Sequence, residues 1–390
     1  METFSKSFKS LGSRFRLINK IGEGTFSSVY KAEDLEYDNY EDRWDLDRTP
    51  EKKRKLVDLE TNLVHPVKKR KDIKHTKIYH RSRKLVAIKR IYVTSSPQRI
   101  LNELELLHDL SGCTSIAPLI TAFRDLDQVV AILPYCDHLD FRDFYRIMSI
   151  SEMRHYMKNL FTGLEHVHKL HILHRDIKPT NFLYHPAKRR GVLVDFGLAE
   201  REYLDPSYCV CREDKEPDHV RRAAERPSVG GYMKNDTRPG RRANRAGTRG
   251  FRAPEVLFKC LNQTTKIDVW SAGVILLSFL SRRFPFFNSS DDIDAMIEIA
   301  TLLGKHKMIK CARQHGAALE ITIPSVFDEG WGFEEICNWL SGTNDAAYSD
   351  TEFTDEEILA YDFLRKCMDV DFQTRMSASD ALKHPFLADL

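Results

Sequence analysis

Hydrophobic and polar positions change their period along the chain, and the change predicts two kinds of structure. The predicted strands lie within residues 15–31, 85–93 and 129–133. Residues 97–110 and 151–170 have apolar residues at helical spacing, the second with Ser151 as its N-terminal cap. From about residue 253 the pattern is mostly helical. The sequence therefore predicts an α+β protein in which a small β-rich lobe precedes a larger α-helical lobe.

The composition is that of a globular protein. Of 390 residues, 42% are hydrophobic and 30% charged, and a net charge of +3 gives no general reason to bind nucleic acid or membrane. Eight scattered cysteines argue against a disulfide framework. No apolar run approaches the roughly 20 residues that span a bilayer, and residues 1–10 lack the apolar core of a secretory signal. These features favour an enzyme of a reducing compartment, without a membrane.

Two polar stretches interrupt the pattern and are interpreted as insertions. The first covers about residues 34–84, and from residue 51 onwards it carries thirteen Lys or Arg and four acidic residues. Its only aromatic residue in that part is Tyr79, so base stacking and direct nucleic-acid binding are not favoured. The basic clusters 52–55 and 68–71 instead predict a bipartite nuclear-import signal and a location in the nucleus. The second insertion covers about residues 200–246.

A glycine-rich turn joins the first two predicted strands. Gly22 and Gly24 let the backbone approach a phosphate closely and direct N–H groups toward it. Val29 and Tyr30 continue as a strand, so the turn belongs to a hairpin and not to the strand-to-helix turn of a dinucleotide fold. Ser27 stands where a third glycine is expected. The candidate nucleotide-binding residues are Ile21, Gly22, Glu23, Gly24, Thr25, Phe26, Ser27, Ser28 and Val29.

Lys89 ends an apolar strand and is a candidate phosphate ligand. A lysine here can simply reach solvent from the strand edge, or it can pair with nucleotide phosphates and with a carboxylate that holds it. Glu103, in the following predicted helix, supplies that carboxylate, and Glu105 is the alternative. We prefer Glu103 because it lies between Leu101 and Leu104, on the side of the helix expected to face inward.

Residues 174–181, with the sequence HRDIKPTN, give the strongest chemical signal. Asp176 and Asn181 are five residues apart with Lys178 between them, and Asp195-Phe196-Gly197 begins fourteen residues after Asn181. Phosphoryl transfer needs a carboxylate that accepts the hydroxyl proton, a cation beside the transferring group and hard oxygen ligands for Mg²⁺. One such tripeptide can be a structural turn, but the ordered set predicts phosphoryl transfer from ATP.

In this order the motifs resemble the signature set of eukaryotic protein kinases. The matching residues are Gly22, Gly24, Lys89, Glu103, residues 174–181 and 195–197, Ala253-Pro254-Glu255, Asp268 and Arg375. The resemblance implies a bilobal kinase domain at 15–387 after a short extension at 1–14. It implies lobes at 15–133 and 139–387, joined by a hinge at 134–138. Lys178, two residues after Asp176, is typical of serine/threonine kinases.

The resemblance also implies a role for each matched residue. Asp176 would be the catalytic base, Lys178 the cation on the phosphoryl group, Asn181 and Asp195 the Mg²⁺ ligands, Lys89 with Glu103 the phosphate anchor, and Thr248 a contact of Asp176 at the substrate site. Val29, Ala87 and Leu133 would line the adenine pocket, with Tyr135 in the hinge. Because every catalytic element is present, a non-catalytic kinase-fold scaffold is the less favoured alternative.

Longer phrases are similar to the cell-division-cycle-seven kinases, in a fungal form. These phrases are residues 20–30, 93–100, 178–184 and 245–255. The family comprises catalytic subunits of the kinase that fires replication origins, and it has inserts in similar places. Asp195 lies 60 residues before Glu255, a shorter span than is usual there, which suits a short or meiosis-specific member. The resemblance implies phosphorylation of the minichromosome-maintenance helicase in DNA replication, the cell cycle or meiosis.

Charge and hydroxyl content predict the substrate and the mode of activation. The basic run comprises Arg238, Arg241, Arg242, Arg245, Arg249 and Arg252. Because Arg249 and Arg252 flank Thr248, we interpret the run as selecting acidic or phosphorylated substrates by guanidinium pairing; a solvated loop is the alternative. An acidophilic casein-kinase-like enzyme is the alternative family. The few hydroxyls available for activating phosphorylation, Ser207, Ser228, Thr237 and Thr248, favour a regulatory subunit that orders the helix around Glu103.

The second insertion also contains a candidate zinc site. Cys209, Cys211 and His219 offer three donors, whereas structural Zn²⁺ takes four. Cys260 is a weaker candidate for the fourth ligand. Free thiols in a loop are the alternative interpretation.

Overall fold

The computed structural model describes residues 14–24, 26–37, 85–125, 128–202, 211, 246–341 and 353–388. The chain divides into two compact units, one formed by Met1–His138 with Val192–Gly197 and the other by Leu139–Gly191 with Leu198–Leu390. Most of both predicted insertions lies outside the described residues, as do residues 1–13 of the extension predicted at 1–14. Within the described parts of the chain, no helix combines the length and the apolar character needed to cross a bilayer.

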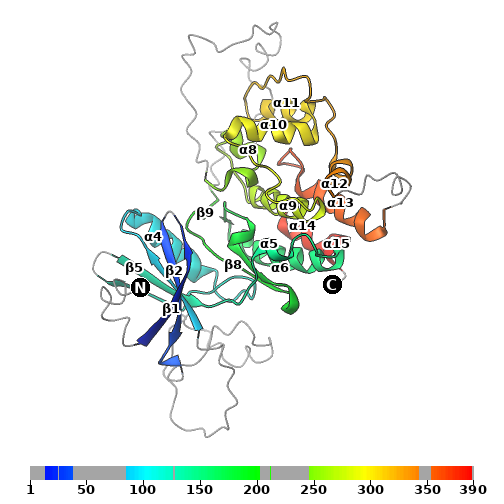
Figure 1. Cartoon of the computed structure of the whole chain (residues 1–390). Coiled ribbons are helices and arrows are strands. Elements are labelled where there is room, and N and C mark those ends of the chain that lie inside the picture. The colour runs from blue at the N-terminus through cyan, green and yellow to red at the C-terminus, as the bar shows by residue number, and fades with distance from the viewer. Residues whose placement is uncertain are drawn as a thin grey trace, which may run out of the picture. The chain divides into compact units, whose positions relative to one another are not determined.

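Among its described residues, the first unit contains a five-stranded antiparallel sheet and helix α4 (Figure 1). The strand order is β1-β2-β3-β5-β4, with bounds Phe15–Glu23, Ser27–Asp34, Leu85–Ile91, Gln128–Pro134 and Thr121–Asp125 in that order. Alternate residues of the strands point to opposite faces, and the apolar set on one face forms the core. That core comprises Phe15, Ala32, Val86, Ile88, Ile120, Val130 and Ile132.

The sheet register gathers other residues on the opposite face. Val29 pairs with Lys89 across β2 and β3, and Ala87 pairs with Leu133 across β3 and β5. Directly paired residues share a face, and on β3 Ala87 and Lys89 alternate with the core residues Val86 and Ile88. The face away from the core therefore carries a lysine surrounded by small and apolar side chains.

Helix α4, Pro97–Asp109, lies in the first unit. It begins where Ser96 accepts a hydrogen bond from the Arg99 amide and where Pro97, which has no amide hydrogen to leave unsatisfied, takes the first turn. The helix buries Glu103, Leu106 and Leu107. Leu101, which the sequence pattern placed among the apolar positions of this helix, is 49% exposed.

The second unit is largely helical (Figure 1). Its longer helices are α6 Ile150–Lys169, α9 Lys266–Leu280, α10 Asp292–Leu303, α11 Lys305–Gln314, α12 Phe333–Ser341 and α13 Asp355–Cys367. Shorter ones are α5 Phe141–Phe144, α8 Pro254–Leu257, α14 Ala378–Lys383 and α15 Pro385–Ala388. The short strands are β6 Ile172–Leu173, β7 Phe182–His185, β8 Arg190–Leu193 and β9 Glu200–Arg201. The last two residues of β8 are assigned to the first unit. The 3₁₀ turns are η3 Pro179–Asn181, η4 Pro186–Lys188 and η7 Arg249–Phe251. The α+β prediction is thus confirmed.

Helices α9 and α6 lie at the centre of the packing in this unit. Every residue of α9 after Lys266 is buried, as expected of a helix that is apolar on all sides, and α6 and α13 pack against it. The N-terminal cap predicted for α6 at Ser151 is wrong, because Ser149 caps the helix. Ser149 accepts from the Glu152 amide while the Glu152 carboxylate accepts from the Ser149 amide, a reciprocal pair that only this spacing allows.

Candidate active site

In the first unit, Lys89 lies between two carboxylates. Its Nζ atom is 2.5 Å from Glu103 Oε1 and 2.8 Å from Asp195 Oδ1. Burial by itself lowers the pKa of Lys89, but the two carboxylates outweigh burial and hold the pKa above its ordinary value. Lys89 is therefore a permanent cation on the sheet face that also carries Val29, Ala87 and Leu133.

The two carboxylates around Lys89 differ in exposure. The Glu103 side chain is 7% exposed, whereas that of Asp195 is 49% exposed, and Glu105 is exposed. Asp195 has a left-handed backbone, with φ of 65°, which is uncommon for a residue with a side chain and typical of functional sites. A buried Glu103 can hold the lysine in place, whereas the Asp195 carboxylate both contacts the lysine and is accessible to solvent.

The glycine-rich turn forms the β1–β2 hairpin. Gly22 pairs with Val29, and Glu23 with Ser28, and the Gly24 amide donates to the Ser27 carbonyl at 2.8 Å. Ile21 and Phe26 are 40% and 41% exposed. Ser28 is buried on the face opposite Val29. Thr25 lies outside the described residues. The hairpin thus has the strand–turn–strand form predicted from the sequence.

Tyr135 follows β5, where the hinge was predicted. The Lys31 ammonium lies 4.0 Å from the centroid of its ring, a cation–π contact. Because Lys31 pairs with Ala87 in the sheet, this contact places Tyr135 beside the face that carries Ala87 and Leu133. The predicted adenine-pocket residues thus lie near one another within the first unit.

In the second unit, Asp176 is the centre of a polar cluster. Its Oδ1 atom accepts from the Thr248 hydroxyl at 2.8 Å and from the Thr248 amide at 2.9 Å. Its Oδ2 atom lies 2.7 Å from Lys178 Nζ and accepts from Asn181 Nδ2 at 3.0 Å. Lys178 also donates to the Thr248 hydroxyl at 2.9 Å. A carboxylate with this many donors is held in one orientation.

The segment before Thr248 packs closely on the segment before Asp176. Gly247 has φ of +97°, and a Cβ atom there would lie 2.3 Å from the Arg175 carbonyl oxygen. Only glycine allows that approach, so Gly247 explains how Thr248 reaches Asp176. Arg175 itself has φ of 69° and pairs with Glu200 at 2.5 Å.

A buried carboxylate holds the backbone of the segment before Asp176, where Arg175 has a positive φ. Asp268 in α9 accepts from the His174 and Arg175 amides, each at 2.8 Å, and lies 3.0 Å from His168 Nε2. Burial by itself raises the pKa of Asp268, but the donors around the carboxylate lower it by a larger amount, so the net shift of the pKa is downward. The role of His168, in α6, has no signal in the sequence because the contact joins two distant helices.

Glu255 and Arg375 form a second buried ion pair. Arg375 NH1 and NH2 donate to Glu255 Oε1 and Oε2 at 2.6 and 2.9 Å, with both side chains almost inaccessible. Two parallel bonds between planar groups fix both orientation and distance. The pair ties the segment that follows Thr248 to the C-terminal part of the chain.

The two arginines that follow Thr248, Arg249 and Arg252, contact Asp292 at the start of α10. Arg252 donates to Asp292 at 2.8 Å and to the Gly247 carbonyl at 2.8 and 3.0 Å. Arg249 donates to the Ser290 carbonyl and keeps 42% of its side chain exposed. Arg238, Arg241, Arg242 and Arg245 lie outside the described residues.

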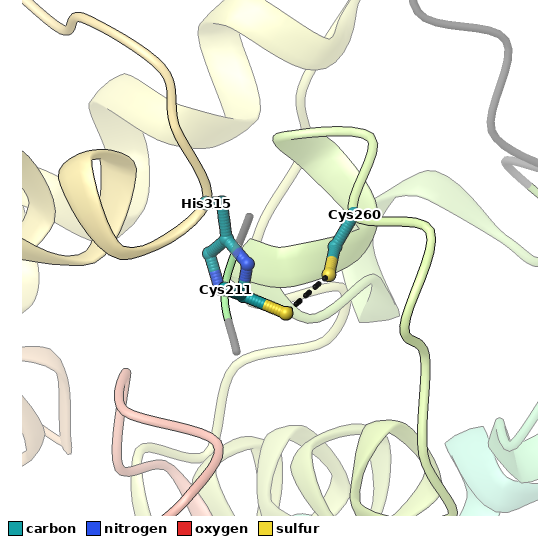
Figure 2. A group of neighbouring side chains, drawn as sticks. All are labelled: Cys211, Cys260 and His315. Atoms are coloured by element: carbon teal, nitrogen blue, oxygen red, sulfur yellow. Dashed lines mark hydrogen bonds between the residues drawn. The ribbon is translucent and has the colours of Figure 1, made fainter. Parts of the chain in front are cut away.

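Cys211, Cys260 and His315 form a compact buried group (Figure 2). The two sulfur atoms are 3.6 Å apart, and the donor atoms of all three residues lie within 4.8 Å of one another. Of the zinc ligands predicted from the sequence, Cys209 and His219 lie outside the described residues. Cys260 joins Cys211 as a donor, and His315 is a member that sequence reasoning missed.

Comparisons with known proteins agree with this geometry. The protein kinase domain family matches residues 74–212 and 229–387. The chain is 46% identical to the cell cycle serine/threonine-protein kinase hsk1 of Schizosaccharomyces pombe, over 99% of this chain and 75% of that protein. It is 38% identical to the cell cycle protein kinase spo4 of the same yeast, over 98% and 87%. It is 25% identical to the human cell division cycle 7-related protein kinase, over 100% and 92%.

The fold, the site and these matches define a serine/threonine protein kinase. Within that class the chain belongs to the family of the cell division cycle 7 kinases, whose members act in the cell cycle. Membership implies ATP and Mg²⁺. Hard oxygen donors suit Mg²⁺, and the accessible Asp195 carboxylate and the Asn181 amide oxygen are of that kind.

Proposed function

We propose that Asp176 is the catalytic base, which accepts the proton of a serine or threonine hydroxyl during phosphoryl transfer from ATP. The observation that carries this role is the carboxylate's fixed position between Thr248, Lys178 and Asn181. Lys178 places a cation where negative charge develops on the transferring group, and Thr248 orders the substrate side of the site.

The first unit binds the nucleotide in this proposal. Lys89, held by Glu103, pairs with the phosphates, and Val29, Ala87 and Leu133 contact the base from the sheet face that they share. Tyr135, in the hinge, would contact the base from the other side of the pocket. Asn181 and Asp195 would hold Mg²⁺, which neutralises phosphate charge when bound.

Substrate selection falls to the arginines beside Thr248. Arg249, 42% exposed, is available to pair with an acidic or phosphorylated residue next to the target hydroxyl. Arg252 already contacts Asp292, so an acidic substrate competes with that carboxylate. Peptide libraries should show a preference for acidic neighbours that Arg249→Ala weakens, whereas Arg283→Ala, a substitution beyond this segment, leaves it unchanged.

A regulatory subunit is proposed to activate the kinase. The Lys89–Glu103 pair is present in the single chain, so the subunit would stabilise helix α4 and not create the pair. Val93, just before α4, is 58% exposed, and Leu101, on α4, is 49% exposed. Both offer apolar surface for that contact. The candidate hydroxyls Ser207, Ser228 and Thr237 lie outside the described residues.

Nuclear replication control is the proposed biological role, with the minichromosome-maintenance helicase as substrate. The test measures phosphate transfer from labelled ATP to an acidic helicase-tail peptide, by the chain alone and with the activating subunit. Transfer that requires the subunit and is lost in Asp176→Asn supports the proposal. Equal transfer by the chain alone contradicts the activator, a broad acidic preference without the subunit favours a casein-kinase-like enzyme, and ATP binding without transfer favours a scaffold.

We also propose a structural Zn²⁺ held by Cys211, Cys260 and His315. Tetrahedral ligation at a Zn–S distance of about 2.3 Å places two sulfur atoms roughly 3.7 Å apart, and the structure has 3.6 Å. The three buried donors are soft or borderline ligands, which suits zinc and not magnesium. Cys209 and His219 are the candidates for a fourth ligand. Such an ion would attach the second insertion to the helical unit.

The zinc proposal is tested on the full-length chain by metal analysis and by cobalt substitution. We expect about one zinc per chain, a thiolate-to-cobalt absorption band, and loss of both in Cys260→Ser and His315→Phe. Cys113→Ser is the matched control and should keep the metal. Metal-free wild-type protein that retains its stability, or equal zinc content in all variants, contradicts the proposal.

A further inference from the structure

Arg99 makes contacts with two functional segments of the first unit at once. Its guanidinium carbon lies 3.8 Å from the centroid of the Phe26 ring in the glycine-rich turn. Its Nε atom donates to the Gly197 carbonyl, two residues after Asp195, at 2.7 Å. One side chain therefore joins the turn predicted to cover the nucleotide to the segment that carries a predicted metal ligand.

The guanidinium group suits this double contact. Its flat face attracts an aromatic ring through the ring quadrupole while its edge donates hydrogen bonds in a fixed plane. A lysine ammonium can make either contact, but it has neither the flat face nor the fixed plane of donors that let arginine make both at once. The backbone of Arg99 is also held in place, because its amide donates to the Ser96 cap of α4.

Helix α4 reaches the segment 195–197 by two routes. Arg99 and Glu103 are four residues apart and therefore lie on the same side of the helix. Glu103 acts through Lys89, which contacts Asp195, and Arg99 acts directly on Gly197. A Cβ atom at Gly197 would lie 3.3 Å from both the Glu103 and the Asp195 carboxylates, so this segment packs tightly against the pair.

We propose that Arg99 is a positioning residue that couples the glycine-rich turn, through Phe26, to the Asp195 segment, through Gly197. It contacts neither the nucleotide nor the transferred group in this account. Its two contacts set how the turn closes over ATP and how the Asp195 carboxylate is aimed. The proposal rests on the roles given above to the glycine-rich turn and to Asp195.

The test compares Arg99→Ala, Arg99→Lys and the matched control Gln98→Ala in the full chain with its activating subunit. Gln98 is the exposed neighbour of Arg99 on α4. In Arg99→Ala we expect kcat to fall about tenfold and KM for ATP to rise about threefold, from loss of a charge-assisted hydrogen bond and a cation–π contact. The Mg²⁺ concentration for half-maximal activity should also rise. Arg99→Lys should recover less than half of the loss, and Gln98→Ala should match the wild type.

The two contacts can be separated with Phe26→Leu, which removes the ring and keeps an apolar side chain. We expect it to raise the Kd of a fluorescent ATP analogue without changing the Mg²⁺ requirement. In the double variant with Arg99→Ala the rise in Kd should be the same as in Arg99→Ala alone, because the second substitution removes a contact already lost. Additive effects on Kd, or Arg99→Ala values within twofold of the control, would overturn the proposal.

Analogue binding also separates this proposal from that of the kinase reaction. If the wild-type chain binds the analogue but transfers no phosphate, the proposed function fails while the Phe26 arm is still measured. If transfer is normal and Arg99→Ala has no effect on Kd, kcat or the Mg²⁺ requirement, only the coupling is refuted. The melting temperature of each variant, expected within about 2 °C of the wild type, excludes simple loss of folding.

Discussion

Two buried ion pairs in the described part of this kinase use similar groups for different purposes. Arg375 and Glu255, in the helical unit, are joined by two parallel hydrogen bonds and have 0% and 1% side-chain exposure. Lys89 and Glu103, in the β-rich unit, share one short contact, and the lysine has a second partner, Asp195, whose side chain is 49% exposed. One pair is closed to solvent, and the other opens on one side.

The difference separates a structural pair from a functional one. A closed bidentate pair has no free donor for a ligand, so its effect is on the position of the segments that it joins. A lysine with three rotatable donors and one accessible partner can exchange that partner for a phosphate at small cost. Burial of an ion pair alone therefore does not indicate its role. Here the two pairs are distinguished by the accessible second partner of Lys89, Asp195.

The largest effect is expected from Lys89→Met. Phosphate transfer should fall about 10³-fold, because the phosphates lose the cation that Glu103 and Asp195 hold in place. The pKa of Lys89 lies above its ordinary value of 10.5, so the contribution of its charge is complete below that pH and is lost only as pH rises through the higher folded value. The loss should thus be the same from about pH 6 to pH 9.

Glu103→Gln is the informative control for this substitution. It keeps an oxygen acceptor for Lys89 and removes the charge, so a smaller loss of about tenfold is expected. Steady-state kinetics with labelled ATP distinguish the two variants. Equal activity of Lys89→Met and wild type would show that Lys89 is a structural cation like Arg375.

Arg375→Met should act on stability and not on chemistry. It leaves Glu255 as an unpaired charge in the protein interior, which costs about 3–4 kcal/mol of unfolding free energy. Adding Glu255→Leu should recover most of that loss, because two apolar side chains then fill the space. Urea unfolding measures both variants, and folded Arg375→Met protein at low temperature should keep more than a third of wild-type transfer. Full stability in the single variant would contradict the structural assignment.

Asp268→Asn tests a buried carboxylate that supports the catalytic segment. An amide can accept from one of the His174 and Arg175 amides but opposes the other with its own NH₂ group, at a cost of about 2 kcal/mol. Because the folded pKa of Asp268 is below its ordinary value of 3.8, the charged form contributes stability above that pH and loses it as pH falls through the folded value. The difference between variant and wild type should be constant from about pH 8 to pH 5 and shrink below pH 4.

Local patterns predicted the elements, and long-range contacts escaped them. Alternation and helical spacing placed strands β1, β2, β3 and β5 and helix α4, whereas β4 was not predicted. Short motifs identified Asp176 and Asp195 as candidate site residues. His168 and His315 have no such signal, because each acts on a partner that is remote in sequence and near only after the helices pack. The cap of α6 was misplaced because two serines, Ser149 and Ser151, lie at the start of the helix, and the prediction did not consider which of them is spaced to pair with Glu152.

Helix caps offer the smallest and most selective test of the comparison between the two units. Ser149→Ala removes the capping box of α6, a helix of the buried helical unit, and should cost about 1 kcal/mol of unfolding free energy without changing KM for ATP. Ser96→Ala removes the cap of α4, which carries Arg99 and Glu103, and should cost no more stability but raise KM for ATP about twofold, because the first turn of α4 then moves. Denaturant unfolding and ATP titrations on both variants provide the measurements. If Ser149→Ala changes KM for ATP as much as Ser96→Ala does, the division into a structural and a functional pair is not supported.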